Sequence, residues 1–491
     1  MEDRANDVVI VGGGPVGMLL AAEIGRYGVA TTVVETLPET HDEPRAGTLH
    51  ARTVQSMARR GYVTPPDRSV AGSERMTTVP FHFAGRPTLV LEAPEAEGPP
   101  MLVLAQAEVE RFFEDRARAA GARILRGTRA VDVVAQPDEV AVHIERNGGE
   151  REVLSAGYVV GCDGARSTVR QRAGITSTTH PPTFAGILGL VRLSEPALFP
   201  GGWTHGPTGS TLANVNPGGL SRVLTHEFGE PMPERNAPVA LADLRSAASR
   251  VHGRDIGMDS PAYLGRFSDF SRLADTYRAG RVLLAGDAAH VHAPLGGQGL
   301  NTGLQDAFNL GWKLAMVALR QSPERLLDSY HSERHPVAAA VIANTRAQAA
   351  LMRPEAAFEP LRDLMSTMLS TPEANSRLSD LITGQGVRYA TGPGLTGTFL
   401  PNKPVGDTTV VQLLQEGRPL LLLTPDTADE HRSVTNGWQG RLTSFTVEDS
   451  PFDQPAVLCR PDGYVAWAGT EPARLAEALE HWFAPTATIA V

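Results

Sequence analysis

The stretch from residue 8 to residue 17 constrains the fold more than any other part of the sequence. It reads Val-Val-Ile-Val-Gly-Gly-Gly-Pro-Val-Gly, a short apolar run that breaks into glycines before a helical pattern begins. Gly12, Gly14 and Gly17 have the GxGxxG spacing that joins a strand to a helix in dinucleotide-binding folds. Gly12 permits a tight turn, Gly14 lets a pyrophosphate approach the backbone, and Gly17 lets the helix pack against the strand. We therefore expect a βαβ unit here.

The residues around these glycines favour a bound dinucleotide. Pro15 and Val16 begin the predicted helix, whose partially positive end suits phosphate groups. A second apolar run, residues 31–34, is followed by Glu35, which lies 18 residues after Gly17. A carboxylate at this place accepts hydrogen bonds from the adenosine ribose. The motif predicts a dinucleotide but leaves FAD and NAD as alternatives.

Two further stretches favour FAD. Residues 281–290 again run from strand to turn, and Asp287 is placed to bond a ribityl hydroxyl of a flavin. A glycine-rich loop then opens a helix, and its N–H groups can stabilise negative charge on a reduced flavin ring. The loop includes Pro294, Gly297, Gln298, Gly299, Leu300 and Asn301. Between these motifs, residues 160–170 form a strand, a turn and a helix that carry Asp163 and Arg166.

Composition limits the other classes of function. A chain of 491 residues is expected to form two or three domains, and 42% hydrophobic with 20% charged residues indicates a globular protein. The net charge is −10 without a basic stripe, so nucleic acid is not expected as a partner. No apolar run is long enough for a membrane helix, and the first residues are too acidic for a signal peptide. We expect a soluble, cytoplasmic protein.

Together these motifs resemble the class A flavoprotein monooxygenases, the p-hydroxybenzoate-hydroxylase-like group. The GxGxxG, the DG-x-R-S-x-VR stretch and the GD-x-A-H…P-x-GGQG-x-N stretch agree with that family in order and spacing over roughly the first 340 residues. The tail beyond residue 390 resembles the thioredoxin-like domain of aromatic-polyketide hydroxylases and rifampicin monooxygenases. It holds no CxxC, so a redox role for it is not expected.

The resemblance implies roles for individual residues. Asp287 would bind the ribityl chain, Pro294 would lie near flavin N5, and Gly299 to Asn301 would line the ring edge. Gln106 would contact the phosphate and ribityl region, and Arg45 would lie in a loop that follows flavin movement. The turn from Asp163 to Arg166 would serve both FAD and NADPH or NADH, which docks transiently.

The resemblance also implies the reaction. A C4a-hydroperoxyflavin, formed from O2 after reduction by NAD(P)H, would hydroxylate a polycyclic aromatic substrate of polyketide type, with antibiotic biosynthesis as the expected role. Inactivation of an antibiotic, as by rifampicin monooxygenases, and Baeyer–Villiger oxygenation are the alternatives. A non-catalytic flavin-binding protein is the alternative from another class. The oligomeric state, monomer or homodimer, stays open.

The expected architecture is α/β with three parts. A Rossmann-like FAD domain comprises residues 1–180 and 276–392, an antiparallel substrate domain comprises residues 181–275 with part of 72–100, and a thioredoxin-like domain comprises residues 393–491. Trp203, His205 and His226 are candidates for substrate contact, although ordinary sheet packing is the favoured explanation for them. His290 and His292 lack a third ligand nearby, so no metal site is predicted. No catalytic base is assigned.

Overall fold

The computed structural model describes residues 6–229, 237–390 and 394–484. The outer ends of the expected domains, the junction at residues 392–393 and the acidic first residues lie outside these ranges. Within the described parts of the chain, no helix is both long enough and apolar enough to cross a membrane.

An eight-stranded sheet forms the centre of the molecule. Its strands are β18 (Arg278–Ala279), β19 (Val282–Leu284), β10 (Arg151–Gly161), β1 (Asn6–Val11), β2 (Thr31–Val34) and β7 (Arg123–Leu125) in that order, with β8 (Thr128–Ala135) and β9 (Val140–Arg146) beyond β10. β1 pairs in parallel with β2 and β10, and β10 pairs in parallel with β19. The run Val8–Val11 is buried on both faces, as an apolar strand without alternation requires.

The predicted βαβ unit is confirmed. Helix α1 (Pro15–Gly25) follows the glycine turn and lies between β1 and β2, and Gly28 follows it with a positive φ. α3 (Gln106–Ala119) and α6 (Gln298–Ala318) pack against α1. The short helices α2 (Ala51–Ala58) and α4 (Thr168–Arg172) also belong to this central part.

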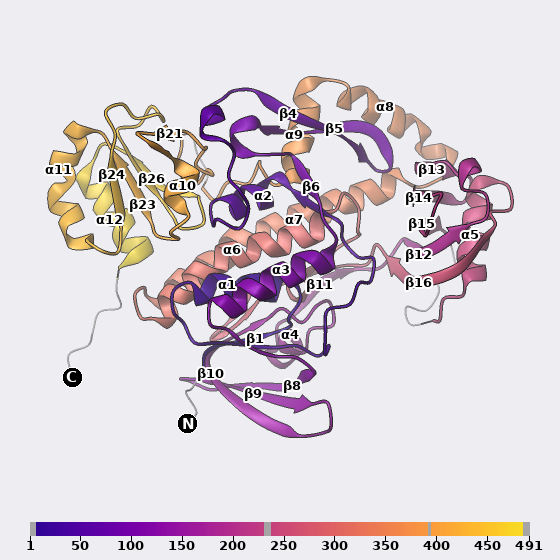
Figure 1. Cartoon of the computed structure of the whole chain (residues 1–491), viewed down its shortest axis with the longest axis horizontal. Helices are drawn as coiled ribbons and strands as arrows, with labels where there is room; N and C mark the ends of the chain where they lie inside the picture. Colours follow the sequence, from indigo (N-terminus) through magenta and orange to yellow (C-terminus); the bar gives the residue numbers. More distant parts are fainter. Residues whose placement is uncertain (1–5, 230–236, 391–393, 485–491) are drawn as a thin grey trace.

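A five-stranded antiparallel sheet lies at one end of the molecule (Figure 1). Its order is β13 (Gly202–Gly206), β14 (Gly209–Asn214), β15 (Ser221–Phe228), β12 (Phe184–Leu193) and β16 (Met258–Ser268). Helix α5 (Leu241–His252) covers one face. The hairpin β4 (Met76–Phe83) and β5 (Arg86–Pro94) packs against α9 (Pro372–Thr383) and α8 (Glu359–Leu369).

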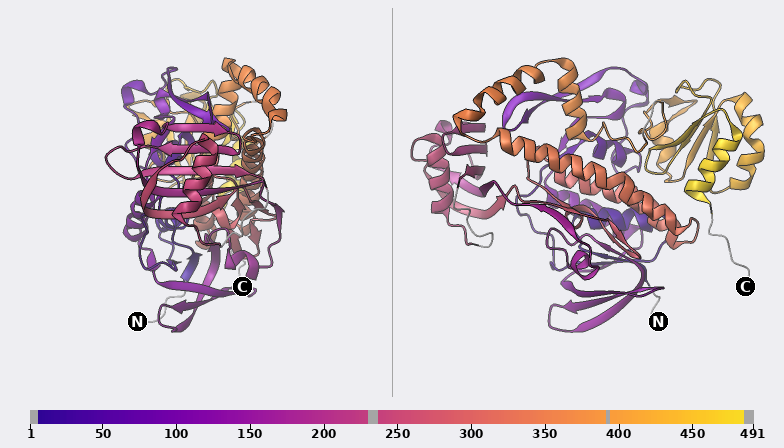
Figure 2. Two further views of the ribbon diagram at one scale, coloured as in Figure 1. Left: turned by 90° about the vertical axis from the view of Figure 1, so that its right-hand side faces the viewer. Right: turned by 180° about the vertical axis from the view of Figure 1, so that it is seen from behind.

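A four-stranded mixed sheet lies at the opposite end, as both broad views show (Figure 1 and the right panel of Figure 2). Its order is β24 (Thr443–Thr446), β23 (Leu420–Leu423), β25 (Ala456–Cys459) and β26 (Val465–Gly469), with only β23 and β24 parallel. Helices α11 (Pro425–Thr435), α12 (Pro472–Phe483) and α10 (Val410–Leu414) flank it. This is the thioredoxin-like part expected from the sequence.

Short ladders connect these parts. They are β3 (Thr48–His50) with β6 (Met101–Val103), β11 (Ser177–His180) with β17 (Ser271–Ala274) and β20 (His290–Val291), and β21 (Pro404–Val405) with β22 (Thr408–Thr409). The long helices α6 and α7 (Asp328–Leu351) lie side by side across the middle of the molecule (Figures 1 and 2). Helix α6 begins at the glycine-rich loop. Residues toward its other end pack against the four-stranded sheet and α12.

Candidate functional site

The turn after β1 has the shape of a phosphate cradle. Gly12 has φ +108°, and a Cβ there would lie 2.3 Å from the Cys162 carbonyl oxygen. A Cβ at Gly17 would lie 1.9 Å from the Gly12 carbonyl oxygen, so α1 approaches the strand too closely for any side chain. A Cβ at Gly14 would meet no atom within 4 Å. Backbone atoms therefore leave no space for a side chain at Gly12 or Gly17, whereas the space beside Gly14 is free. Gly14 directly precedes the N-terminus of α1 and its unpaired N–H groups.

Glu35 lies directly beside this turn. Its Oε2 accepts a hydrogen bond from the Gly13 N–H at 2.5 Å, and its Oε1 accepts one from the Leu37 N–H at 2.7 Å. These two bonds fix the carboxylate at the end of β2, next to the open side of the cradle. Its remaining lone pairs are available to hydroxyl donors. The arrangement fits the adenosine end of a dinucleotide.

Asp287 follows β19, which runs parallel to β10 and β1, so it lies near the same edge of the sheet as the glycine turn. It belongs to the single helical turn Gly286–Ala288, and its side chain is exposed to solvent. Burial among the surrounding residues raises the pKa of Asp287, and the nearby Arg45 guanidinium opposes that effect. Such a carboxylate suits a flavin with several hydroxyls on its ribityl chain.

The loop that carries Arg45 joins the start of α3 to the five-stranded sheet. Gln106 holds the loop from one side, because its N–H donates to the Ala46 carbonyl at 3.0 Å and its Oε1 accepts from the Ala46 N–H at 3.4 Å. The Arg45 carbonyl accepts from Arg222 in β15 at 2.9 Å. The Arg45 guanidinium is half exposed and pairs with Glu43 at 2.8 Å.

The turn of Asp163 lies beside the glycine turn, because the Cys162 N–H donates to the Val11 carbonyl at 2.7 Å. Asp163 Oδ2 accepts from the N–H groups of Thr168 and Val169 and so caps α4. Its Oδ1 is buried and has no hydrogen-bond partner among the described residues. Burial raises the pKa of this carboxyl, and the hydrogen bonds oppose that effect. Arg166 lies exposed on the same turn.

Arg170 ties this turn to that of Asp287, a role that sequence reasoning missed. Its Nη1 donates to the Ala288 carbonyl at 2.7 Å, and its Nη2 donates to the Ala165 carbonyl at 3.1 Å. The sequence signal was present, since Arg170 closes the DG-x-R-S-x-VR stretch. Its partners were not predictable, because residues 165 and 288 meet only through the pairing of β10 with β19.

The glycine-rich loop is braced from behind. Gly297 has φ +66° at the start of α6, and Asn301 Nδ2 donates to the carbonyls of Thr48 and Gly297 at 3.0 and 2.8 Å. Asn301 Oδ1 accepts from the His50 N–H at 2.7 Å, and His50 Nε2 donates to the Gly296 carbonyl at 2.7 Å. Gln298 is also buried, whereas Gly299 and Leu300 are half-buried and Pro294 is exposed. The loop thus keeps a fixed shape with one side accessible.

The predicted substrate residues form one aromatic cluster. The Trp203 ring lies 5.1 Å from the rings of both His82 and His226 and 6.3 Å from that of His205, measured between centroids. His82, from the β4–β5 hairpin, was not predicted; it stacks on Phe81, which contacts His50 behind the glycine-rich loop. Trp203 Nε1 and the Nδ1 atoms of His82 and His226 are buried, with no hydrogen-bond partner in the described ranges.

These histidines are neutral near pH 7. Burial lowers the pKa of His226 to about 3, and it lowers those of His82 and His50 to about 4. His205 is also shifted down by burial, although its Nε2 bonds to the Gly85 carbonyl at 3.1 Å. A neutral imidazole has one N–H donor and one acceptor nitrogen. The cluster therefore combines flat apolar rings with donors and acceptors that have no partner.

Two family models match the chain. The FAD binding domain matches residues 5–345, and the aromatic-ring hydroxylase C-terminal domain matches residues 393–486. The first of these regions contains the glycine turn, Glu35, the Asp163 turn, Asp287 and the glycine-rich loop.

Proteins that are similar over nearly the whole chain include monooxygenases. A rifampicin monooxygenase of Streptomyces venezuelae is 38% identical over 97% of this chain and 98% of its own. A 12-dehydrotetracycline 5-monooxygenase/anhydrotetracycline 6-monooxygenase of Streptomyces rimosus is 36% identical over 98% and 99%. The dialkyldecalin synthase of Streptomyces rugosporus is 37% identical over 98% and 100%.

The solved structures include CabE, an aromatic hydroxylase from angucycline biosynthesis. It superposes with a TM-score of 0.87 at 35% identity, covering 98% of this chain and 100% of CabE. The match extends over nearly the whole chain, and the fold and family expected from the sequence are confirmed. The chain belongs to the FAD-dependent aromatic-ring hydroxylases, a family of flavoprotein monooxygenases.

Proposed function

We propose that this chain hydroxylates a polycyclic aromatic compound of polyketide type, with FAD, O2 and NADPH or NADH. When bound, FAD supplies the redox chemistry that transfers one oxygen atom to the substrate. The names of the relatives support the substrate class, because rifampicin, tetracycline and angucycline enzymes all match nearly the whole chain. Biosynthesis is the leading role; inactivation of an antibiotic or Baeyer–Villiger oxygenation would use the same flavin site.

The domain assignment forms part of this proposal. Residues 1–180 and 276–392 hold FAD, residues 181–275 with part of 72–100 hold the substrate, and residues 393–491 close the chain. The position of the five-stranded sheet and of the β4–β5 hairpin supports the second part. The residues that contact FAD are proposed to be Gly12, Gly14, Pro15, Val16, Gly17, Glu35, Arg45, Gln106, Asp163, Arg166, Asp287, Pro294, Gly297, Gln298, Gly299, Leu300 and Asn301.

The unpartnered atoms of the aromatic cluster carry the substrate proposal. A buried polar group without a hydrogen-bond partner costs about 1–3 kcal/mol. A ligand that bonds to the unpartnered atoms of Trp203, His82 and His226 removes this cost, and the binding free energy becomes more favourable. The Trp203 N–H donates to a carbonyl, and a bare imidazole nitrogen accepts from a hydroxyl. An arene with a hydroxyl beside a carbonyl satisfies both requirements. The surrounding rings stack on such a ligand and exclude water.

The neutral histidines also supply the acceptor that sequence reasoning left unassigned. A phenol that donates its O–H to His82 or His226 becomes richer in electrons at the ring carbons, which favours attack on an electrophilic oxygen. Because these imidazoles have pKa values of about 4 and 3, they hold the proton through a hydrogen bond and are not protonated by a phenol.

The first experiment measures NADPH oxidation with a panel of hydroxylated anthracycline, angucycline, tetracycline and ansamycin compounds under labelled O2. We expect one compound to accelerate NADPH loss and to gain one labelled oxygen atom. Trp203→Phe keeps the ring but removes the N–H, so KM for that compound should rise about tenfold, the equivalent of one hydrogen bond. The matched variant Trp438→Phe, in the C-terminal part, should leave KM unchanged. Equal KM values for the two variants would show that Trp203 does not bind the substrate.

A second candidate is a reaction without net redox change on a bound substrate. The 37% identical dialkyldecalin synthase favours it, because that relative is named for a synthase and not for an oxygenase. This candidate predicts bound FAD, no substrate-dependent NADPH or NADH oxidation and no labelled oxygen in the product. Incorporation of label by any compound of the panel excludes it.

A further inference from the structure

The segment between β25 and β26 places a charged cluster against the FAD-binding part. Arg460 Nε donates to Asp462 Oδ1 at 3.0 Å, and Arg460 Nη2 donates to Glu333 Oε2 of α7 at 2.9 Å. Arg460 also bonds to Glu333 through Nη1 and to Asp462 through a second contact. All three side chains are buried.

Helix α6 completes the cluster. Lys313 Nζ donates to Glu333 Oε2 at 2.7 Å, and Asn309 Nδ2 donates to the same oxygen at 2.7 Å. The cluster therefore has two cations, Arg460 and Lys313, and two anions, Glu333 and Asp462. Burial lowers the pKa of Lys313 to about 8; burial alone would raise that of Glu333, but the two cations lower it to about 2.

The residue after Glu333 continues the contacts toward the flavin turn. Arg334 Nε donates to Asp306 Oδ1 at 2.8 Å. Asp306 Oδ2 accepts from the Gly286 N–H at 3.1 Å and contacts His290 Nε2 at 2.6 Å. Gly286 precedes Asp287 directly. The contacts thus run from the C-terminal sheet to the turn that carries the proposed ribityl ligand.

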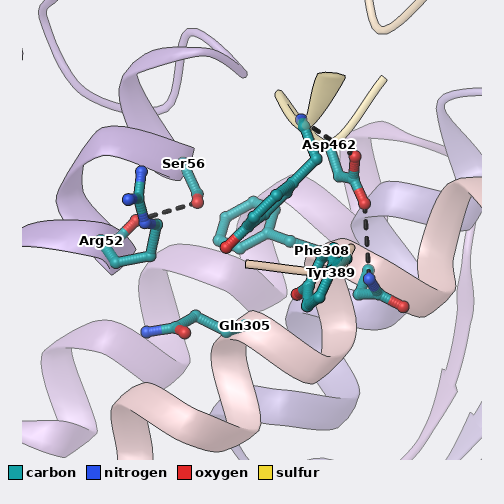
Figure 3. Close-up of a pocket in the computed structure, with 8 residues that line it drawn as sticks. Arg52, Ser56, Gln305, Phe308, Tyr389 and Asp462 are labelled. Atoms are coloured by element: carbon teal, nitrogen blue, oxygen red, sulfur yellow. Dashed lines mark hydrogen bonds between the residues drawn. The ribbon is translucent and has the colours of Figure 1, made fainter. Parts of the chain in front are cut away.

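Tyr389 provides a second connection. Its Oη accepts from Arg334 Nη1 at 3.2 Å, and its ring lies 4.1 Å from that of Tyr464 in the C-terminal part. Figure 3 shows Tyr389 and Asp462 among the residues that line a small cavity, together with Phe308 and Gln305 of α6. Arg334 is therefore held both through its neighbour Glu333 and directly through Tyr389.

We propose that Arg460, Asp462 and Tyr464 are positioning residues for FAD. They hold Glu333 and Tyr389, which fix Arg334, and Arg334 orients the Asp306 carboxylate that bonds to the Gly286 N–H. The thioredoxin-like part thus contributes to cofactor binding by mechanical support, without cysteine chemistry. This inference rests on the proposed role of Asp287 in holding the flavin, and it does not depend on the identity of the substrate.

The test titrates apoprotein with FAD and follows flavin fluorescence. Tyr389→Phe removes the acceptor of Arg334 Nη1 without changing charge. Arg460→Met with Asp462→Asn removes one positive and one negative charge, so the Lys313–Glu333 pair stays balanced. We expect the Kd for FAD to rise about tenfold in the double variant and about threefold in Tyr389→Phe. Amide exchange of the apoprotein should rise at residues 286–289 more than in β1.

The matched control is Arg441→Met. Arg441 Nη2 donates to the carbonyls of Gln321 and Phe483 at 2.8 and 2.6 Å, so it connects the same parts of the chain at the far end of α6. We expect it to lower Tm while the Kd for FAD stays within about twofold of wild type.

Two outcomes overturn the inference. One is a Kd for FAD within about twofold of wild type in Tyr389→Phe, which also decides the case if the double variant does not fold. The other is an equal rise in Kd in Arg441→Met, which would indicate a general loss of stability. Asp287→Asn is measured in parallel: unchanged FAD affinity there refutes the proposed role of Asp287, whereas lost affinity there with unchanged Tyr389→Phe refutes the positioning role alone.

Discussion

Gly14 and Gly17 are three residues apart in the same turn, yet a side chain meets opposite surroundings at the two positions. At Gly14 a Cβ has free space, whereas at Gly17 it would lie 1.9 Å from the Gly12 carbonyl oxygen. The space at Gly14 is therefore not needed for folding of the protein alone. It is the space in which we propose that a pyrophosphate lies against the backbone.

This contrast predicts different defects. Gly14→Val should fold with Tm of the apoprotein nearly unchanged but should lose FAD binding, because the side chain occupies the phosphate space. Gly17→Ala should destabilise the apoprotein by about 3 kcal/mol through overpacking. Thermal unfolding and FAD titration of both apoproteins make the comparison. A Gly14 variant that retains wild-type affinity would place the pyrophosphate elsewhere.

His226 makes stability depend on pH. Burial lowers its folded pKa to about 3, below the ordinary value of 6.5, so only the unfolded chain binds a proton between those values. Its contribution to stability is therefore complete above pH 6.5 and is lost as the pH falls. His226→Phe should weaken the pH dependence of the free energy of unfolding by up to about 1.4 kcal/mol per pH unit between pH 4 and 6. Denaturation curves across this range test it; parallel curves for both proteins contradict it.

At the scale of elements, the start of α6 depends on a single amide. Asn301 bonds to Thr48, Gly297 and His50, and so joins the helix, the glycine-rich loop and the β3–β6 ladder. Truncation removes three hydrogen bonds to main-chain groups, one of them buried and two part-buried. The accessible side of the loop keeps its shape only while this bracing is intact.

Asn301→Ala should lower the free energy of unfolding by about 3 kcal/mol and should weaken FAD binding. Asn344→Ala, which removes one bond at 3.3 Å to Gln298, is the matched control and should cost about 1 kcal/mol. Urea denaturation gives both values. A similar loss of unfolding free energy in the two variants would show that the three Asn301 hydrogen bonds together contribute no more than one ordinary hydrogen bond.

At the scale of the whole molecule, the C-terminal part is integral to the fold. Trp312 of α6 is fully buried, with its ring centroid 6.3 Å from that of Trp482 and 5.8 Å from that of Phe483. Residues of the C-terminal part also shield the charges of Lys313 and Glu333 from solvent. A buried charge that loses its partner costs about 3–5 kcal/mol.

A chain that ends at residue 392 should therefore be insoluble or unfolded, although it retains every residue that we propose to contact FAD. The soluble yield and the ratio of flavin to protein, compared with the full chain, measure this. A soluble truncated chain with bound FAD would show that the C-terminal part is an independent module.

The sequence by itself determined the βαβ unit, the α/β fold class and the FAD family. These follow from local patterns: an apolar run, glycines at fixed spacing, and motifs whose residues are neighbours in the chain. It also pointed to Trp203 and His226, because aromatic residues in an alternating strand are visible without a structure.

Only the tertiary structure decided which groups meet. Arg170 reaches Ala288, His82 joins Trp203, and Arg460 reaches Glu333 through pairings of segments more than 100 residues apart. No local pattern encodes such contacts, because each partner satisfies its own strand or helix equally well without the other. The free energy of these charged and polar groups depends on burial, and burial is a property of the assembled fold.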